Sequence, residues 1–196
     1  MSNPPPRLPL PEPPFDAALA ERLVRLMPVR SALPPLALFR LLATDAPLSE
    51  AMRTMGAFQL RHAPGEASSI TPRDREIVIL RSCARCDCVY EWGVHVTAYG
   101  QRVGLSAEQI QATLATGCDH PVWSAPDRAL LQLVDELHNT ARVSDSAWAA
   151  LQSFWSDSQC LHLLTLVGWY HLIAFICNGA RLSPEPWAAR PVALAT

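Results

Sequence analysis

The sequence predicts an all-α protein, and three observations carry this prediction. Apolar residues recur at helical spacing in segment after segment, as Leu19, Leu23 and Leu26 do. Helix-start signals precede several of these segments, as where Ser106 is followed three residues later by Gln109. No segment shows a convincing strand-like alternation of apolar and polar residues. Because 196 residues can bury one sizeable core, we expect a single helical domain.

The expected helices follow from these signals and from the prolines and glycines that stop them. Thr71, Pro72 and Asp74 open the first of two central helices, which a tight turn near residues 85–87 separates from the second. Gly104 can take the left-handed conformation past the end of the second. In chain order we expect helices over residues 15–27, 35–43, 47–59, 71–85, 87–104, 106–114, 124–142, 144–154 and 156–179.

Both ends of the chain are expected to lack helices. Residues 1–14 contain seven prolines, which exclude a helix, so we interpret them as an extended or disordered arm. Residues 183–196 contain three prolines and are interpreted as an extended tail. The all-α domain is therefore expected to span residues 15–182.

The composition of the chain limits the binding partners and the cell compartment that we expect. Hydrophobic residues make up 49% of the chain and charged residues 17%, and the formal net charge is −2. These values give no electrostatic reason for binding nucleic acid or an anionic membrane. We find no secretory signal at the start of the sequence, so we expect a cytoplasmic protein whose six cysteines are reduced.

The longest apolar run, residues 160–177, is interrupted by two histidines, a threonine and a glycine. A membrane span needs about 20 predominantly apolar residues. We therefore interpret this run as a buried or interface helix that needs more cover than one subunit supplies.

One helix face carries the candidate chemistry. Cys88, Glu91, His95 and Tyr99 follow at spacings of three, four and four, so they share one face of the second central helix. An imidazole near carboxylates is suited to general acid–base catalysis, because charge and burial adjust its pKa. We take this stripe, with Glu76 of the preceding helix, as the candidate site. We expect Glu76 and His95 within hydrogen-bond reach, both bordering a cavity that Cys88 and Glu91 also touch. Taken singly, Glu76 fits an ion pair with Arg73 or Arg81, and His95 a structural histidine.

The three neighbouring cysteines leave alternatives open. Cys83, Cys86 and Cys88 with His95 are a weak match to a zinc site, because no second pair of ligands follows at the usual spacing. Two of these thiols are also close enough in sequence for a redox pair, or all three are small buried hydrophobes. Cys88 lies near a helix N-terminus, which lowers the pKa of a thiol. From the sequence we assign no metal site and no cofactor site.

The remaining aromatic and histidine residues receive weaker assignments. Trp92 flanks the stripe and is expected to pack against neighbouring helices, and Tyr170 is a candidate lining residue of the pocket. We interpret His138, His162 and His171 as structural residues rather than ligands, because they lie on leucine-rich helices.

The pattern of Glu76, Cys88, Tyr90-Glu91-Trp92 and His95, followed by Gly104-Leu105-Ser106, resembles the carboxymuconolactone decarboxylase and alkylhydroperoxidase D-like superfamily. The stretch WSAPDRALLQLVDELH is similar to its longer members, and the resemblance covers about residues 39–182. It implies an all-α helical bundle that assembles as a homotrimer or homohexamer, with pockets near subunit contacts.

The resemblance implies two kinds of chemistry. In the peroxidase branch a glutamate, two cysteines and a histidine form a thiol relay, and here Glu76, Cys88 and His95 match the first, second and last of these. Glu91 stands at the second cysteine position, so Cys86 would have to act as the resolving thiol. The decarboxylase branch fits better at Glu91 and His95, and it needs neither a metal nor an organic cofactor.

We therefore expect an enzyme that performs acid–base chemistry on a small organic acid or lactone. His95 would move the proton, Glu76 and Glu91 would orient it, and Tyr99, Cys86, Trp92 and Tyr170 would line the pocket. Thiol-dependent hydroperoxide reduction through Cys88 is the first alternative. A non-catalytic oligomer that binds a small ligand is the second.

Overall fold

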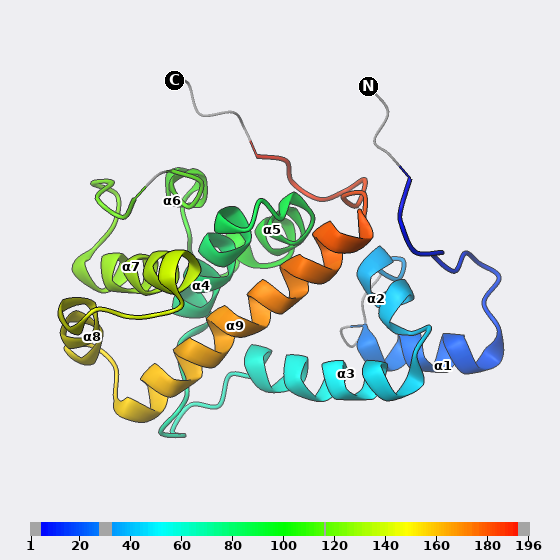
Figure 1. The fold of residues 1–196 in the computed structure, drawn as a ribbon, viewed down its shortest axis with the longest axis horizontal. Helices are drawn as coiled ribbons and strands as arrows, with labels where there is room; N and C mark the ends of the chain where they lie inside the picture. The colour runs from blue at the N-terminus through cyan, green and yellow to red at the C-terminus, as the bar shows by residue number, and fades with distance from the viewer. Residues whose placement is uncertain (1–4, 28–32, 116, 192–196) are drawn as a thin grey trace.

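The computed structural model describes residues 5–27, 33–115 and 117–191, and within them all regular structure is helical (Figure 1). The predicted all-α fold is confirmed. The elements, in chain order, are α1 (Ala17–Leu26), α2 (Ala37–Leu42), α3 (Ala46–Leu60), α4 (Pro72–Arg85), α5 (Val89–His95), the π-helix η1 (Val96–Gly100), α6 (Ala107–Ala112), α7 (Ala125–Thr140), α8 (Asp145–Gln152) and α9 (Asp157–Ala180).

The helix starts follow the capping signals of the sequence. The Thr71 hydroxyl accepts a hydrogen bond from the backbone N–H of Asp74, so α4 begins where expected. Reciprocal capping boxes, in which each side chain bonds the other's backbone N–H, open three more helices: Ser106 with Gln109, Ser124 with Asp127 and Ser156 with Gln159.

The second central helix differs from the prediction. Its α-helical part ends at His95, and residues 96–100 continue as the π-helix η1. The Gly93 carbonyl explains the change, because it accepts bonds from the Thr97 hydroxyl (3.0 Å) and from the Ala189 backbone N–H (3.3 Å). Side-chain and tertiary donors of this kind compete with the regular helical ladder. Gly104, at φ +80°, completes the turn that follows.

Helix α4 is the centre of the fold. Every residue from Arg75 to Cys83 is buried, because α5, α7 and α9 pack around this helix (Figure 1). Helix α9 is long and apolar enough to cross a membrane, but half of its most apolar 18-residue stretch is buried inside the molecule. A core helix of the domain accounts for that composition.

The segment after α9 folds back onto the domain. Its described part, residues 183–191, contains no helix and is packed against the domain. The Glu185 carboxylate accepts hydrogen bonds from the backbone N–H of Ala37 (2.7 Å) and from the Tyr90 hydroxyl (2.6 Å). A Cβ atom at position 93 would lie 2.3 Å from the Ala189 carbonyl oxygen, so only glycine allows this approach. Residues 183–191 thereby join α2 to α5.

The arm before α1 also contacts the domain. The backbone N–H of Arg7 donates to the Ala180 carbonyl, and the Arg40 guanidinium bonds the Pro11 carbonyl and pairs with Glu12. Residues 1–4 of the predicted arm and 192–196 of the predicted tail lie outside the described residues.

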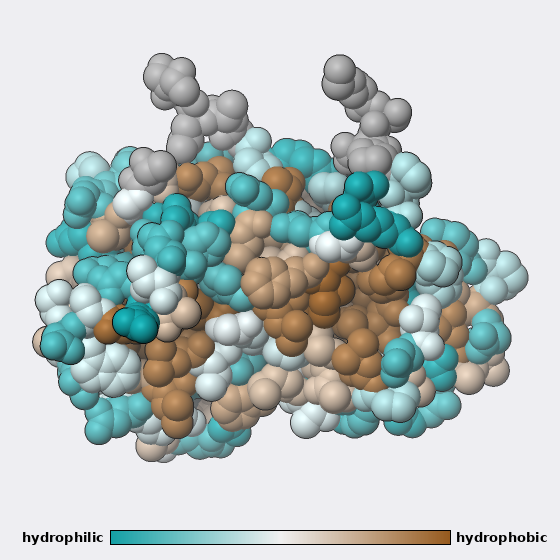
Figure 2. Space-filling view, in the orientation of Figure 1, coloured by the Kyte–Doolittle hydropathy of each residue, from teal (hydrophilic) through white to brown (hydrophobic). Residues whose placement is uncertain are grey.

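One face of α9 is apolar and is not covered by the other residues that the structure describes. Leu161, Leu172 and Phe175 are 63%, 42% and 66% exposed. Figure 2 shows apolar side chains gathered across the middle of the face that α9 crosses. The described residues thus leave part of this helix exposed.

Candidate active site

A buried hydrogen bond between Glu76 and His95 forms the base of the site. Glu76 lies in the second turn of α4, and His95 is the last residue of α5, so the packing of these helices brings the side chains together. The Glu76 Oε2 to His95 Nδ1 distance is 2.7 Å, and the two side chains are 0% and 3% exposed. The expected contact between them is present.

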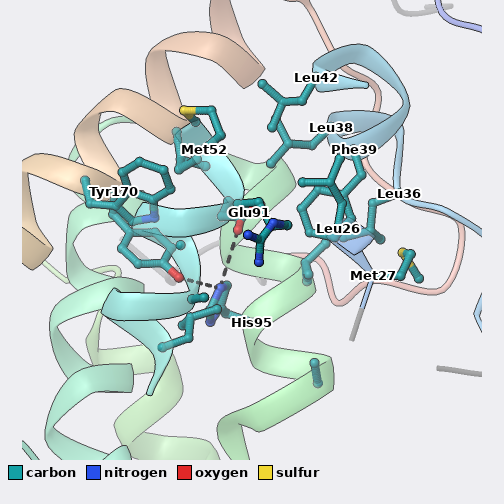
Figure 3. Close-up of a pocket in the computed structure, with 18 of the residues that line it drawn as sticks. Leu26, Met27, Leu36, Leu38, Phe39, Leu42, Met52, Glu91, His95 and Tyr170 are labelled. Carbon is teal, nitrogen blue, oxygen red and sulfur yellow. Dashed lines mark hydrogen bonds and ion pairs between the residues drawn. The ribbon is translucent and has the colours of Figure 1, made fainter. Parts of the chain in front are cut away.

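The other ring nitrogen of His95 faces two further polar groups. The Tyr170 hydroxyl on α9 lies 3.1 Å from Nε2, and Oε1 of Glu91 lies 3.4 Å from the same atom. Figure 3 shows both side chains pointing toward the imidazole. His95 is therefore held between carboxylates on both sides, with a phenol beside it.

These neighbours decide the charge of His95. Burial by itself lowers the pKa of the imidazole, but the charges and hydrogen bonds of Glu76 and Glu91 outweigh burial and raise the pKa to about 10. At neutral pH His95 is thus an imidazolium. Burial and the nearby charges of Glu91 and Glu76 raise the pKa of Tyr170 well above its usual value, so its hydroxyl stays neutral.

Arg75 completes the charge balance of the cluster. Its Nε lies 3.5 Å from Oε1 of Glu76, so two carboxylates face two cations in a buried space. Balanced charge makes the burial tolerable, since an unpaired buried carboxylate costs several kcal/mol. The partners suggested by sequence alone are engaged elsewhere: Arg73 pairs with Asp127, and Arg81 pairs with Asp135.

His95 and Glu91 border a cavity of about 380 Å³. Most of its wall is apolar. Residues of α1, α2 and α3 and of the segments beside them form one side of it, as Figure 3 shows. Tyr99 and Tyr170, both expected in the pocket, also line it. Glu76, which we also expected at the cavity, lies behind His95 and does not line it. The apolar lining includes Leu26, Leu36, Leu38, Phe39, Leu42 and Met52.

Three polar side chains reach the cavity. Oε2 of Glu91 is buried and has no hydrogen-bond partner among the described residues. Arg25 and Arg53 also line the cavity, with side chains 60% and 39% exposed, so they lie at its open end. Sequence patterns did not point to these arginines, because they lie on α1 and α3, far in sequence from His95.

Two expected lining residues lie elsewhere. Trp92 does not line this cavity, because its indole N–H donates to the Thr113 hydroxyl (3.0 Å) in the core. Cys86 does not line it either, because it caps the end of α4 and faces His138 of α7. Both assignments to the pocket are corrected.

Cys88 is buried at the N-terminus of α5 and also does not line the cavity, contrary to our expectation. A hydrogen bond from the Cys177 thiol lowers the pKa of Cys88, against the opposing effect of burial. The partner of Cys88 is thus Cys177 on α9 rather than Cys86. A separation of 89 positions hides such a pair from sequence analysis.

The arrangement is suited to proton transfer. An imidazolium with a raised pKa is a proton donor, and its buried partners hold the ring in one orientation. This proton donor lies at the wall of an apolar cavity that is large enough for a small organic molecule.

Comparisons with known proteins bear on the family and the fold. Residues 46–134 match the model of the carboxymuconolactone decarboxylase family. Among solved structures, an uncharacterized peroxidase-related protein from Silicibacter sp. TM1040 is 17% identical, with a TM-score of 0.75 over 95% of this chain and 96% of that one. A second such protein, an alkylhydroperoxidase AhpD core from Ralstonia eutropha JMP134, is 17% identical, with a TM-score of 0.73 over 94% and 95%.

A more distant solved structure is the debrominase Bmp8, which is 12% identical, with a TM-score of 0.61 over 86% of this chain and 87% of that one. At these identities the likeness concerns the fold. Among curated proteins, no sequence matches this chain significantly.

Proposed function

Because the chain belongs to the carboxymuconolactone decarboxylase and alkylhydroperoxidase D-like superfamily, we propose that it is an enzyme for acid–base chemistry on a small organic acid or lactone. One observation carries this proposal: the His95 imidazolium is fixed between Glu76 and Glu91 at the wall of an apolar cavity. The chemistry uses only side chains of the chain itself.

The proposed step is decarboxylation or a related proton transfer. The bond between the carboxylate and the neighbouring carbon breaks, carbon dioxide leaves, and the electron pair moves into an adjacent carbonyl or lactone group. His95 donates its Nε2 proton to the resulting carbanion or enolate, and solvent later returns a proton to the ring. Glu76 keeps the ring oriented, and Glu91 stabilises the imidazolium before transfer.

Charge at the open end of the cavity supports an anionic substrate. The guanidinium groups of Arg25 and Arg53 border the entrance, and their partners, Glu21 and Glu50, are surface residues. A guanidinium binds a carboxylate through two parallel hydrogen bonds. A substrate whose carboxylate binds near the arginines would place its apolar part against the leucines of α2.

We expect small unsaturated or keto carboxylic acids to bind and the matching alcohols to bind much more weakly. Replacing Arg53 by Gln should weaken the binding of acids by about tenfold, the loss of one charge-assisted bond of ~1.5 kcal/mol. Calorimetric titration with a panel of acids, lactones and alcohols measures this.

Arg61→Gln is the matched control, because Arg61 is as exposed as Arg53 and pairs with Glu66 outside the cavity. Equal affinity for acids and alcohols, or equal loss in both variants, would contradict the proposed substrate class.

A second candidate function, thiol-dependent hydroperoxide reduction, is favoured by the lowered pKa of Cys88 and its contact with Cys177. The Cys88 thiolate would attack the peroxide, the O–O bond would break and release an alcohol, and Cys177 would displace water from the sulfenic acid to form a disulfide. An external dithiol would supply the two electrons.

We expect this turnover to be slow or absent, because each thiol is only 1% exposed and neither lines the cavity. A coupled assay with an organic hydroperoxide and a dithiol reductant tests it. Rapid turnover that Cys88→Ser and Cys177→Ser abolish, and Cys86→Ser does not, would promote this function over acid–base chemistry.

We also propose that the protein forms a homotrimer or homohexamer in the cytoplasm. The apolar face of α9 supports assembly, since a subunit in isolation exposes Leu161, Leu172 and Phe175. The free cysteines suit a reducing compartment. Sedimentation should give a mass above that of one subunit, and Phe175→Glu should lower it; a stable wild-type monomer at micromolar concentration contradicts the assembly.

A further inference from the structure

A second cluster of reactive side chains lies apart from the His95 site, where three helices meet. Cys86 caps the C-terminus of α4, His138 lies in the last turns of α7, and His171 lies in the middle of α9. One ligand atom of each, a thiol sulfur or a ring nitrogen, lies within 4.8 Å of the other two. None of these residues lines the cavity beside His95.

The distances are close to those of a metal site. Nδ1 of His138 is 3.1 Å from Nε2 of His171 and 3.9 Å from the Cys86 sulfur. Around a tetrahedral zinc ion, with bonds of ~2.0–2.1 Å to nitrogen and ~2.3 Å to sulfur, the nitrogens are about 3.3 Å apart and a sulfur–nitrogen pair about 3.6 Å. Small side-chain rotations would bring the three atoms to these separations.

The hydrogen bonds around the cluster orient its ligand atoms. Nδ1 of His171 donates to the Val167 carbonyl at 2.8 Å, so Nε2 carries the lone pair that faces the cluster. A backbone carbonyl that accepts from the other ring nitrogen is the usual arrangement for a metal-bound histidine. The Asn178 amide holds the Cys86 carbonyl at 2.7 Å, which fixes the backbone of the thiol ligand.

The surroundings allow an ion to enter. All three residues are half-buried, so the cluster is reachable from solvent. A neighbouring guanidinium, that of Arg85, is engaged by Asn139 and Asp135. One thiolate and two imidazoles form a donor set that selects zinc-like divalent ions over magnesium or calcium.

From this geometry we propose that Cys86, His138 and His171 form a site for Zn²⁺ or a similar divalent ion. The three ligands leave a fourth position for water. Bound there, the ion cross-links α4, α7 and α9, the helices that support the acid–base site. Our interpretation of the two histidines as purely structural is thereby revised.

Cobalt and zinc titrations of the untagged, chelator-treated and reduced protein test the site. We expect one Co²⁺ per chain, a thiolate-to-cobalt charge-transfer band, displacement by Zn²⁺, and a higher melting temperature with Zn²⁺ present. Cys86→Ser should remove the band and the binding. His138→Gln and His171→Gln should each weaken binding by at least about tenfold.

Four further variants keep the test decisive. Cys86→His should retain Co²⁺ binding without the thiolate band, which separates loss of a ligand from loss of folding. Cys118→Ser and His62→Gln, which change a cysteine and a histidine outside the cluster, should bind as the wild type does. His95→Gln should also bind the ion fully, so this test is independent of the proposed reaction.

Absence of stoichiometric binding by the wild type would overturn the site. Binding that survives Cys86→Ser and both histidine variants, or that is lost in Cys118→Ser, would place the ion elsewhere and overturn it equally.

Discussion

His95→Gln is expected to lower the rate of the reaction by about 10²–10⁴-fold, the usual contribution of a positioned general acid. Gln occupies similar space, and its amide N–H can donate to the Tyr170 hydroxyl oxygen as the Nε2–H of the imidazolium does, but it cannot transfer a proton to a carbanion. We expect the helical circular dichroism spectrum and the assembly state to stay unchanged. The measurement is the steady-state rate with an acid identified by the binding panel.

His162→Gln is the matched control for His95→Gln, because His162 is also a buried histidine, 4% exposed, but lies outside the cavity. Its rate should equal that of the wild type. If His95→Gln retained full activity while folded, His95 would not be the proton donor, and the catalytic proposal would fail with it.

The second large effect concerns the stability that Glu76 gives to the imidazolium. The folded-state pKa of His95, about 10, lies above its unfolded value of about 6.5. A raised pKa gives stability that is fully present below about pH 6.5 and is lost as pH rises toward 10. Glu76→Gln removes the closest opposite charge, so it should cost about 3–5 kcal/mol near pH 6, as for a broken buried ion pair.

Urea unfolding between about pH 6 and pH 9 measures this effect. The free-energy difference between the wild type and Glu76→Gln should be largest at low pH and should shrink as pH rises. Because His95→Gln removes the titrating group, adding Glu76→Gln to it should leave no pH-dependent difference of this kind. A pH-independent cost in both backgrounds would show that Glu76 acts through packing alone.

Local signals predicted much of this molecule. Capping boxes and prolines placed the helix starts, since these effects act within a few residues. The helical spacing of Glu91, His95 and Tyr99 correctly predicted that they line one cavity. Glu76 of the preceding helix bonds His95, as predicted. The π-helix was not predictable in this way, because its cause is a bond from the distant Ala189 to the Gly93 carbonyl.

The parts that sequence analysis missed depend on contacts between distant helices. Cys88 meets Cys177, and Cys86 meets His138, only because α9 and α7 pack against α4. Placing Trp92 in the pocket failed for the same reason, since its partner Thr113 lies on the far side of the helix. Helical spacing identifies the residues that share one face of a helix, but it does not identify the residues of other helices that this face contacts.

The π-helix after His95 has a consequence for how this helix accommodates changes in length. A π-turn holds one residue more than the α-helical turn it replaces, so η1 amounts to a single inserted residue absorbed without displacing either end. Deleting one residue between Val96 and Gly100 should let the segment close as an α-helix. His95 would keep its place, whereas the phase of the helix around Tyr99 would change and one wall of the cavity would be rebuilt.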